Sequence, residues 1–311
     1  MPIVKVNNLV KRYGSILAVD NLCLSIEKGE TFGLVGPNCA GKSTTIKMLV
    51  GLLKPDRGEI FINGIDIVQN HKEIKRNIGL VPQDVAIYEN MSARENIEFF
   101  GSLYGLYGKN LKEMASEALE FSGLYEKQNE RPKKFSGGMK RRLNIACSIV
   151  HKPQILIMDE PTVGIDAQSR NHILSSVKEL GKSGTTVIYT SHYMEEVESL
   201  CTRIGIVDFG RIIAIGNKNE LKNLIDSEEI VAMELDNTSD FRLDELSSLD
   251  EVSSAVLHGN QLQIVTSNSH GILQDIIEII LRQDKKIINI NLNTPSLENV
   301  FLKLTGRNLR D

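Results

Sequence analysis

The architecture of this chain follows from Gly36-Pro37-Asn38-Cys39-Ala40-Gly41-Lys42-Ser43: a glycine, four further residues and then Gly-Lys-Ser. An apolar run at 31–35 precedes it and predicts a strand, and 44–50 predicts a helix. In this setting, backbone N–H groups and a helix N-terminus converge on one point that suits polyphosphate. Lys42 is expected to reach phosphate oxygens, and Ser43 to offer its hydroxyl to Mg²⁺. An ordinary glycine turn is the alternative.

Length and composition predict a soluble chain of two domains. With 311 residues, the chain is long for one compact domain. It is 41% hydrophobic and 24% charged, as ordinary soluble proteins are. No apolar run reaches the roughly 18 residues of a membrane span, and no basic segment followed by an apolar one predicts a secretory signal. A role at a membrane would therefore need a partner.

Charge and cysteine usage indicate a cytosolic protein that does not bind nucleic acid. The formal net charge is -4, which argues against a dominant nucleic-acid surface. The acidic excess lies near the end, with 16 acidic and 9 basic residues from Asn217 onward. The 4 cysteines, Cys23, Cys39, Cys147 and Cys201, lack the spacing of a metal site or a disulfide framework. A reducing compartment is the simplest interpretation.

The residues around the glycine-rich loop predict an antiparallel β layer beside the main sheet. Strands are expected at residues 3–6, 22–26, 59–62 and 78–81. Asn63-Gly64 between apolar runs is a hairpin signal. Tyr13 falls in the predicted first loop, where it could stack on a nucleotide base or be a half-buried tyrosine at a strand end. The strand at 78–81 ends just before Gln83.

Residues from about 84 to 150 predict an all-helical insertion into an α/β domain. Ser92-Ala93-Arg94-Glu95 fits a capping box that opens a helix to about Tyr104. Further helices are expected over 112–122 and 139–150. Ser136-Gly137-Gly138 stands at the start of the last helix, where N–H groups and the helix dipole favour an anion. A second anion site and a plain helix cap both fit that position.

Two later strands end in side chains that suit phosphate chemistry. Residues 155–158 are a continuous apolar run, typical of a central parallel strand, and Asp159-Glu160 follow. One carboxylate could hold magnesium while the other orients or deprotonates water. A strand predicted at 185–190 precedes His192, which would lie at the same edge of the sheet. For His192 alone, a structural histidine is the alternative.

In this order, the motifs resemble the ATP-binding subunit of an ABC transporter, and the resemblance covers residues 1 to about 216. They are Tyr13, residues 36–43, Gln83, Ser136-Gly137-Gly138, Asp159-Glu160, Asp166 and His192. The resemblance implies an α/β fold with a P-loop NTPase (ABC ATPase) core, an antiparallel β layer and a helical insertion over residues 1–216. Residues 217–311 predict a small C-terminal α+β domain.

The resemblance implies a nucleotide and metal site. Tyr13 would stack on the adenine of ATP, and the phosphates would lie against Gly36, Pro37, Asn38, Cys39, Ala40, Gly41, Lys42, Ser43 and Thr44. Ser43, Gln83 and Asp159 would hold Mg²⁺, with Gln83 also sensing the membrane partner. The catalytic residues would be Glu160, which acts on the attacking water, together with His192 at the γ-phosphate, Lys42 and Gln83.

The resemblance also accounts for two anion sites beside a single phosphate loop. In a head-to-tail pair of subunits, Ser136, Gly137 and Gly138 would bind the ATP held by the other subunit, and Asp166 would lie at the same interface. Two ATP molecules would then join two chains, expected to be a homodimer. Hydrolysis would let the chains part and would drive a membrane permease.

Two positions depart from the family pattern. The family usually has glycine where this chain has Cys39, so the backbone freedom of the loop is in doubt and a reactive thiol could stand beside bound phosphate. Residues 135–139 read Phe-Ser-Gly-Gly-Met where Leu-Ser-Gly-Gly-Gln is commoner. With Lys140-Arg141-Arg142, this form resembles the daunorubicin-resistance-like exporter branch, which works with ABC-2-type permeases.

The C-terminal residues predict strands at 229–235, 252–257, 261–266 and 286–292, a helix at 270–283 and a last helix from Pro295 to near Gly306. We expect an ATPase subunit at the cytoplasmic face of the cell membrane, bound peripherally to a separate export permease. A soluble ABC ATPase acting on ribosomes or DNA is one alternative, but such proteins usually carry two cassettes or a long coiled coil. A regulator that binds nucleotide without hydrolysis is another, supported by Cys39 alone.

Overall fold

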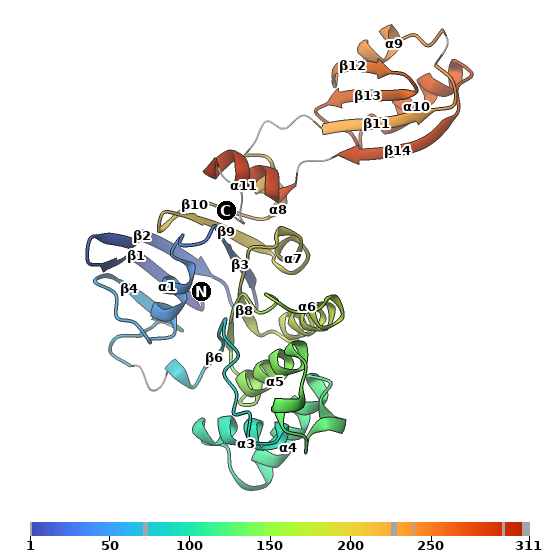
Figure 1. The fold of residues 1–311 in the computed structure, drawn as a ribbon. Helices are drawn as coiled ribbons and strands as arrows, with labels where there is room; N and C mark the ends of the chain where they lie inside the picture. Colours follow the sequence, from blue (N-terminus) through green and yellow to red (C-terminus); the bar gives the residue numbers. More distant parts are fainter. Residues whose placement is uncertain (1, 71–73, 225–228, 239, 294–295, 307–311) are drawn as a thin grey trace. The chain divides into compact units, whose positions relative to one another are not determined.

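The chain of the computed structural model divides into two units (Figure 1). Each unit has its own hydrophobic core. The structure describes residues 2–70, 74–224, 229–238, 240–293 and 296–306. The first unit comprises Met1–Lys218 together with Leu304–Asp311, and the second comprises Asn219–Lys303. Pro295, at the start of the predicted last helix, lies outside the described residues.

A six-stranded sheet forms the centre of the first unit, in the order β10-β9-β3-β8-β7-β6. Its strands are β10 (Arg211–Gly216), β9 (Arg203–Asp208), β3 (Thr31–Val35), β8 (Thr186–Ser191), β7 (Ile155–Asp159) and β6 (Ile78–Val81). All neighbours pair in parallel except β10 with β9. Every residue of β3, β7 and β8 is buried, as their continuous apolar runs predict. The segments after β3, β6, β7 and β8 therefore meet at one edge of the sheet.

A second, antiparallel sheet has the order β2-β1-β4-β5 and confirms the predicted β layer. Its strands are β1 (Val4–Tyr13), β2 (Ile16–Ile26), β4 (Arg57–Ile62) and β5 (Ile65–Asp66). Helix α1 (Lys42–Leu49) shares one core cluster with residues of both sheets. Figure 1 shows α1 and this sheet on one side of the central strands, with α5, α6 and α7 on the other.

The first two strands are longer than predicted, and the placement of Tyr13 in a loop was wrong. Tyr13 is the last residue of β1 and pairs with Ile16. The pairing of β1 with β2 has register shifts, and Asn8 and Asn21 have positive φ angles of 46° and 49°. Such bulges break the alternation of apolar and polar residues on which strand prediction depends.

The helical insertion lies between β6 and β7. It contains α3 (Ala93–Leu103), α4 (Gly108–Phe121) and α5 (Gly137–Ile149), joined by short 3-10 turns at Tyr125–Lys127 and Pro132–Lys134. The capping box is confirmed, because Glu95 N–H donates to Ser92 Oγ and Ser92 N–H donates to the Glu95 carboxylate. Helices α4 and α5 begin at glycines and start earlier than predicted. Because glycine is a poor helix former, the sequence pattern does not predict a helix at these positions.

Two further helices of the first unit, α6 (Ala167–Lys182) and α7 (Met194–Leu200), follow β7 and β8.

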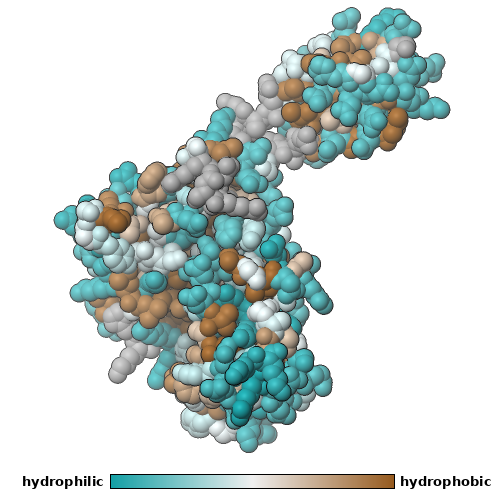
Figure 2. Space-filling model, in the orientation of Figure 1, coloured by the Kyte–Doolittle hydropathy of each residue, from teal (hydrophilic) through white to brown (hydrophobic). Residues whose placement is uncertain are grey.

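The surface visible over α5 in Figure 2 is predominantly hydrophilic. Lys133 and Lys134, just before α5, are both exposed, so this basic segment is solvated. None of the helices in the described ranges is long and apolar enough to cross a bilayer.

The second unit has the element order β11, α9, β12, β13, α10, β14, and its four strands form an antiparallel sheet in the order β12-β13-β11-β14. The elements are β11 (Glu229–Leu235), α9 (Asp244–Ser247), β12 (Val252–His258), β13 (Gln261–Thr266), α10 (Leu273–Arg282) and β14 (Ile287–Asn293). Buried Ile276 and Ile280 of α10 pack with Val231 and Met233 of β11. The predicted small α+β fold is confirmed. Helices α8 (Lys218–Lys222) and α11 (Leu297–Thr305) flank these elements in sequence.

Candidate active site

The predicted phosphate loop joins β3 to α1, and its lysine is folded back over it. The Lys42 side chain is 6% exposed. Its Nζ donates to the carbonyl oxygens of Gly36, at 2.7 Å, and Pro37, at 3.0 Å. Burial lowers the pKa of Lys42, while the carboxylates of Glu160 and Asp159 oppose that shift. The ammonium group is thus held at the centre of the loop, where phosphate oxygens would bind.

Backbone geometry explains part of the loop sequence. Gly41 has a φ of 100°, and a Cβ there would collide with the carbonyl oxygen of Ala18. Only glycine fits this position. Cys39 also has a positive φ, of 63°, and its side chain is exposed near the tip of the loop beside Asn38. The glycine usual in the family at this position matches that conformation, which is strained for cysteine.

Asp159, the last residue of β7, and Glu160, which follows it, are held by a residue that the sequence did not single out. Asp159 Oδ1 accepts from Thr190 Oγ1 at 2.8 Å, and Glu160 N–H donates to the same hydroxyl at 2.9 Å. Both carboxylate side chains are mostly buried. Thr190 pairs with Asp159 in the parallel register of β7 and β8. Knowledge of this strand register would have identified Thr190 as the residue beside Asp159.

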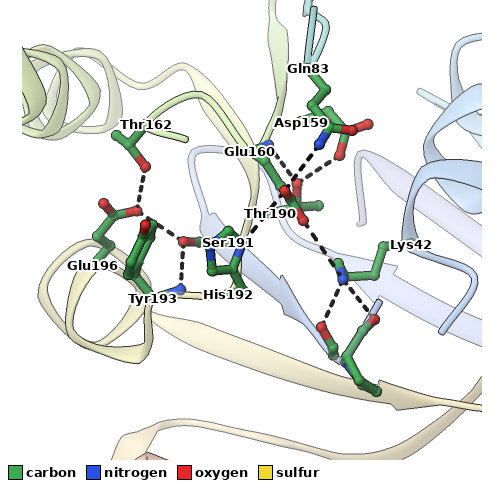
Figure 3. Close-up of polar contacts among 12 residues, drawn as sticks. Lys42, Gln83, Asp159, Glu160, Thr162, Thr190, Ser191, His192, Tyr193 and Glu196 are labelled. Atoms are coloured by element: carbon green, nitrogen blue, oxygen red, sulfur yellow. Dashed lines mark hydrogen bonds and ion pairs between the residues drawn. The ribbon is translucent and has the colours of Figure 1, made fainter. Parts of the chain in front are cut away.

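Three of the predicted residues converge on Glu160. Its Oε2 accepts from Gln83 Nε2 at 3.3 Å and lies 3.5 Å from His192 Nδ1, and its Oε1 lies 3.8 Å from Lys42 Nζ. Figure 3 shows the three nitrogen-bearing side chains directed at this carboxylate from different segments of the chain. The structure therefore brings the four predicted catalytic residues into one cluster at the edge of the sheet.

The side chains beside this cluster fit a magnesium ion. Ser43 and Thr44 are half-buried in the first turn of α1. Ser43, Asp159 and Gln83 offer hydroxyl, carboxylate and amide oxygens, the hard donors that Mg²⁺ prefers. In the described part of the chain, no group of three or more His, Cys, Asp or Glu side chains could hold a metal ion. Magnesium at phosphate sites generally uses only one or two protein carboxylates, so this donor set suits it.

Ser136-Gly137-Gly138 lies on a different side of the sheet from α1. Ser136 is the N-cap of α5, and its Oγ accepts from Met139 N–H at 3.3 Å. Gly138 packs against α6, because a Cβ on it would collide with Ser169 Oγ. Asp166 caps α6, and the N–H of Ser169 that donates to it lowers the pKa of its carboxyl. Gly138 and Asp166 are thus neighbours. Their helices, α5 and α6, lie on the other side of the central strands from α1, which begins at Lys42 (Figure 1).

Tyr13 stands apart from the Glu160 cluster in its contacts. Its side chain is 48% exposed at the end of β1, and Lys11 Nζ lies 5.9 Å from the ring centroid. No hydrogen bond or ion pair within the described ranges joins it to Glu160. The ring is accessible for stacking.

Arg141 is a further residue that sequence reasoning missed. Its guanidinium is buried and donates to the carbonyl oxygens of Pro82, at 2.6 Å, and Gln83. This contact ties α5 to the segment that carries Gln83. A run of basic residues predicts a solvated surface, so it does not indicate that one member is buried against a segment about 60 residues earlier.

Comparison with known proteins agrees with this geometry. The family model described as ABC transporter matches residues 19–163. The chain is 45% identical to the linearmycin resistance ATP-binding protein LnrL of Bacillus subtilis (strain 168), with 98% of each chain covered. It is 35% identical to the daunorubicin resistance ATP-binding protein DrrA2 of Streptomyces coeruleorubidus, over 97% of this chain and 95% of that one. A solved ATP-binding cassette, described as a dimeric post-hydrolysis state bound to ADP and Pi, is 28% identical, with a TM-score of 0.63 over 69% of this chain and 98% of its own.

Proposed function

The chain belongs to the ABC transporter family as an ATP-binding subunit of the exporter branch, and from this membership we propose how its residues perform the work of that family. It is an ATPase that binds ATP, pairs with a second ATP-binding subunit and drives a separate membrane permease for export. The roles of individual residues, the metal ion and the class of permease are proposals.

ATP is proposed to bind with its phosphates against residues 36–44 and its adenine on Tyr13. The Lys42 ammonium already lies inside the loop, bound to the carbonyls of Gly36 and Pro37. Phosphate oxygens can replace those carbonyls as acceptors, since a Lys ammonium binds phosphate as a mobile point charge. Asn38 and Cys39, exposed at the tip, leave the approach to the loop open.

Hydrolysis is proposed to depend on the cluster around Glu160. Mg²⁺, held by Ser43, Asp159 and Gln83, would neutralise charge that develops on the phosphates. Glu160 would orient the attacking water and accept its proton, while His192 would contact the γ-phosphate. The observation that carries this proposal is the convergence of Lys42, Gln83 and His192 on one carboxylate beside the loop.

We propose a head-to-tail homodimer in which Ser136, Gly137 and Gly138 cover the ATP of the other subunit and Asp166 lies at the interface. The division of the two sets of residues between opposite sides of the sheet supports this arrangement. We also propose an ABC-2-type permease as the partner, which would hold the chain at the cytoplasmic face of the cell membrane.

Co-purification tests the choice of partner. The chain is expressed in its native host with an affinity tag, and membranes are extracted in mild detergent. A polytopic membrane protein is expected at near-equal amounts, and an untagged strain serves as the control. Recovery only in the soluble fraction, with ribosomes or DNA attached, would overturn the permease proposal. A purified chain that binds ATP but never hydrolyses it would instead favour the regulator alternative.

A further inference from the structure

A buried carboxylate on α7 lies near the active site but outside the proposed catalytic cluster. Glu196, on α7, is 4% exposed. Its Oε2 accepts from three hydroxyl groups: those of Thr162 and Tyr189, each at 2.8 Å, and that of Ser191 at 2.9 Å. Burial of a carboxylate is costly unless hydrogen bonds offset the lost hydration. An apolar side chain would fill the space more simply, so this network points to a task beyond packing.

The hydroxyl donors come from segments on both sides of the catalytic cluster. Thr162 follows Glu160 by two positions and leads toward Asp166, whereas Ser191 directly precedes His192. Ser191 Oγ also accepts from the N–H of the residue after His192, at 2.9 Å. Figure 3 shows Glu196 between Thr162 and Ser191. One oxygen atom therefore holds the segment after Glu160 and the segment that presents His192.

A second set of contacts connects Glu196 to the predicted dimer interface. Arg170 Nε, in the first turn of α6, lies 3.5 Å from Glu196 Oε1, and its guanidinium carbon lies 4.6 Å from the ring centroid of Tyr193. Helix α6 begins at its cap Asp166, against which Gly138 packs. Contacts therefore run without a break from His192, through Tyr193 and Arg170, to α6.

Arg170 and Glu196 are close enough for an ion pair but too far apart for a short hydrogen bond. Arg170 Nε and Glu196 Oε1 are both buried, and neither has a hydrogen-bond partner within the described ranges. An N–O separation of 3.5 Å is longer than the roughly 2.7–2.9 Å of a charge-assisted hydrogen bond. A small movement of α6 toward α7 would close the pair.

We propose that Glu196 is a positioning residue that makes the His192 segment and the Asp166 segment move together. The state of the γ-phosphate at His192 is then passed to Asp166 and to the Ser136–Gly138 segment at the dimer interface. This inference rests on the proposed function, in which His192 contacts the γ-phosphate and Asp166 faces the other subunit. Two packed segments with a shared anchor are a physical route for such coupling.

Steady-state ATP turnover of the full-length chain tests the first half of the proposal. Glu196→Gln keeps the size of the side chain but removes its charge. Its NH2 group cannot pair with Arg170, and its one amide oxygen is a weaker acceptor for the three hydroxyl groups than the carboxylate. We expect kcat to fall about tenfold to hundredfold, the scale of small misplacements in an active site. KM for ATP should stay within about twofold, because the phosphate loop is untouched. Glu195→Gln, exposed on the same helix, is the matched control and should leave both constants unchanged.

A double-mutant cycle separates positioning from a general structural effect. If Glu196 acts through His192, then Glu196→Gln should cost less than about twofold in kcat in a His192→Ala background. A full additional loss, or a rise in KM with kcat unchanged, would overturn the proposal. If Glu196→Gln does not fold, Thr162→Val and Ser191→Ala each remove one hydroxyl donor and should show the same pattern. Absence of turnover in the unmodified chain would instead count against the proposed function.

ATP-induced dimerisation tests the second half. In a Glu160→Gln background, which prevents hydrolysis, adding Glu196→Gln should raise the Kd of the dimer in Mg-ATP about tenfold, equivalent to about 1.4 kcal/mol of coupling. Sedimentation velocity measures this Kd, and Glu195→Gln again serves as the control. An unchanged dimer Kd would show that Glu196 does not reach the interface and would overturn the coupling.

Discussion

Glu160 occupies a backbone conformation that few residues of its type adopt. Its φ is 47°, in the left-handed region. This conformation costs an L-residue about 1–2 kcal/mol. The bond from its N–H to Thr190 and the contacts of its carboxylate with Gln83 hold it there. Strain of this kind is typical of functional sites, where the surrounding structure fixes a group that must face a substrate.

Replacing this carboxylate by an amide should separate ATP binding from turnover. Glu160→Gln keeps the side-chain shape but removes the proton acceptor. We expect ATP turnover to fall by about 10²–10⁴-fold, the contribution of a general base. Binding of Mg-ATP should persist, and the dimer should accumulate on size-exclusion chromatography. A variant with normal turnover would show that another group activates the water.

The loop residue Cys39 offers a second prediction at the residue scale. Cys39→Gly should raise the free energy of unfolding by up to about 1 kcal/mol, since relief of the left-handed strain exceeds the entropic cost of glycine. Cys39→Val should lower it by more than about 1 kcal/mol, because β-branched residues are rarely found at positive φ. Urea denaturation of both variants measures the difference. Equal stabilities would mean that residue 39 does not have the observed φ of 63°.

At the scale of elements, His151 joins the helical insertion to the central sheet. Its ring stacks on Tyr104, just after α3, with a centroid distance of 3.5 Å and an interplanar angle of 4°. Its Nε2 donates to the carbonyl oxygen of Ile78 in β6 at 3.2 Å. Burial lowers the pKa of His151 to about 4. The neutral ring is therefore the form that packs between these elements.

This packing should make stability depend on pH. The pKa of His151 in the folded chain lies below the roughly 6.5 of an unfolded histidine. The contribution of the neutral ring to the free energy of unfolding is therefore complete above pH 6.5 and is lost as the pH falls toward 4. The loss should reach up to about 3 kcal/mol. In His151→Phe, the free energy of unfolding should vary less between pH 7 and pH 4 than in the unmodified chain. If the free energy of unfolding changed equally with pH in the two proteins, His151 would not be the source of the pH dependence.

The sequence predicted elements and sites well where the information is local. The loop at residues 36–43, the strands that end near Asp159 and His192 and the capping box at Ser92 each depend on a few adjacent residues, and the structure agrees. The lengths of β1 and β2 could not be predicted, because bulges at Asn8 and Asn21 break the alternation. Thr190 and Arg141 were also missed, since their partners lie on segments distant in sequence.

For the whole molecule, we propose that the two units are separate domains, as expected from a boundary near residue 216. Only the first unit contains the proposed nucleotide site. A ligand stabilises the folded form that binds it, by about 2.7 kcal/mol at a hundredfold excess over its Kd. Calorimetry of the Glu160→Gln chain should therefore show one transition that rises in temperature with Mg-ATP and one that does not move.

A matched control completes this calorimetric test. Lys42→Ala removes the ammonium group that we place at the phosphates, so neither transition should shift with Mg-ATP. A single transition that moved as a whole in Glu160→Gln would show that the two units unfold cooperatively. In that case they would not be independent domains.

The pairing of β11 with β14 in the second unit has a consequence for the history of such chains. Ile230, near the start of β11, pairs with Asn293 at the end of β14. The chain therefore enters and leaves this sheet at neighbouring backbone positions. A segment whose two ends lie together can be inserted, lost or exchanged by recombination without changing the path of the chain in the rest of the protein. The unit is in this sense portable, and the same ATPase could acquire different appendages in different lineages.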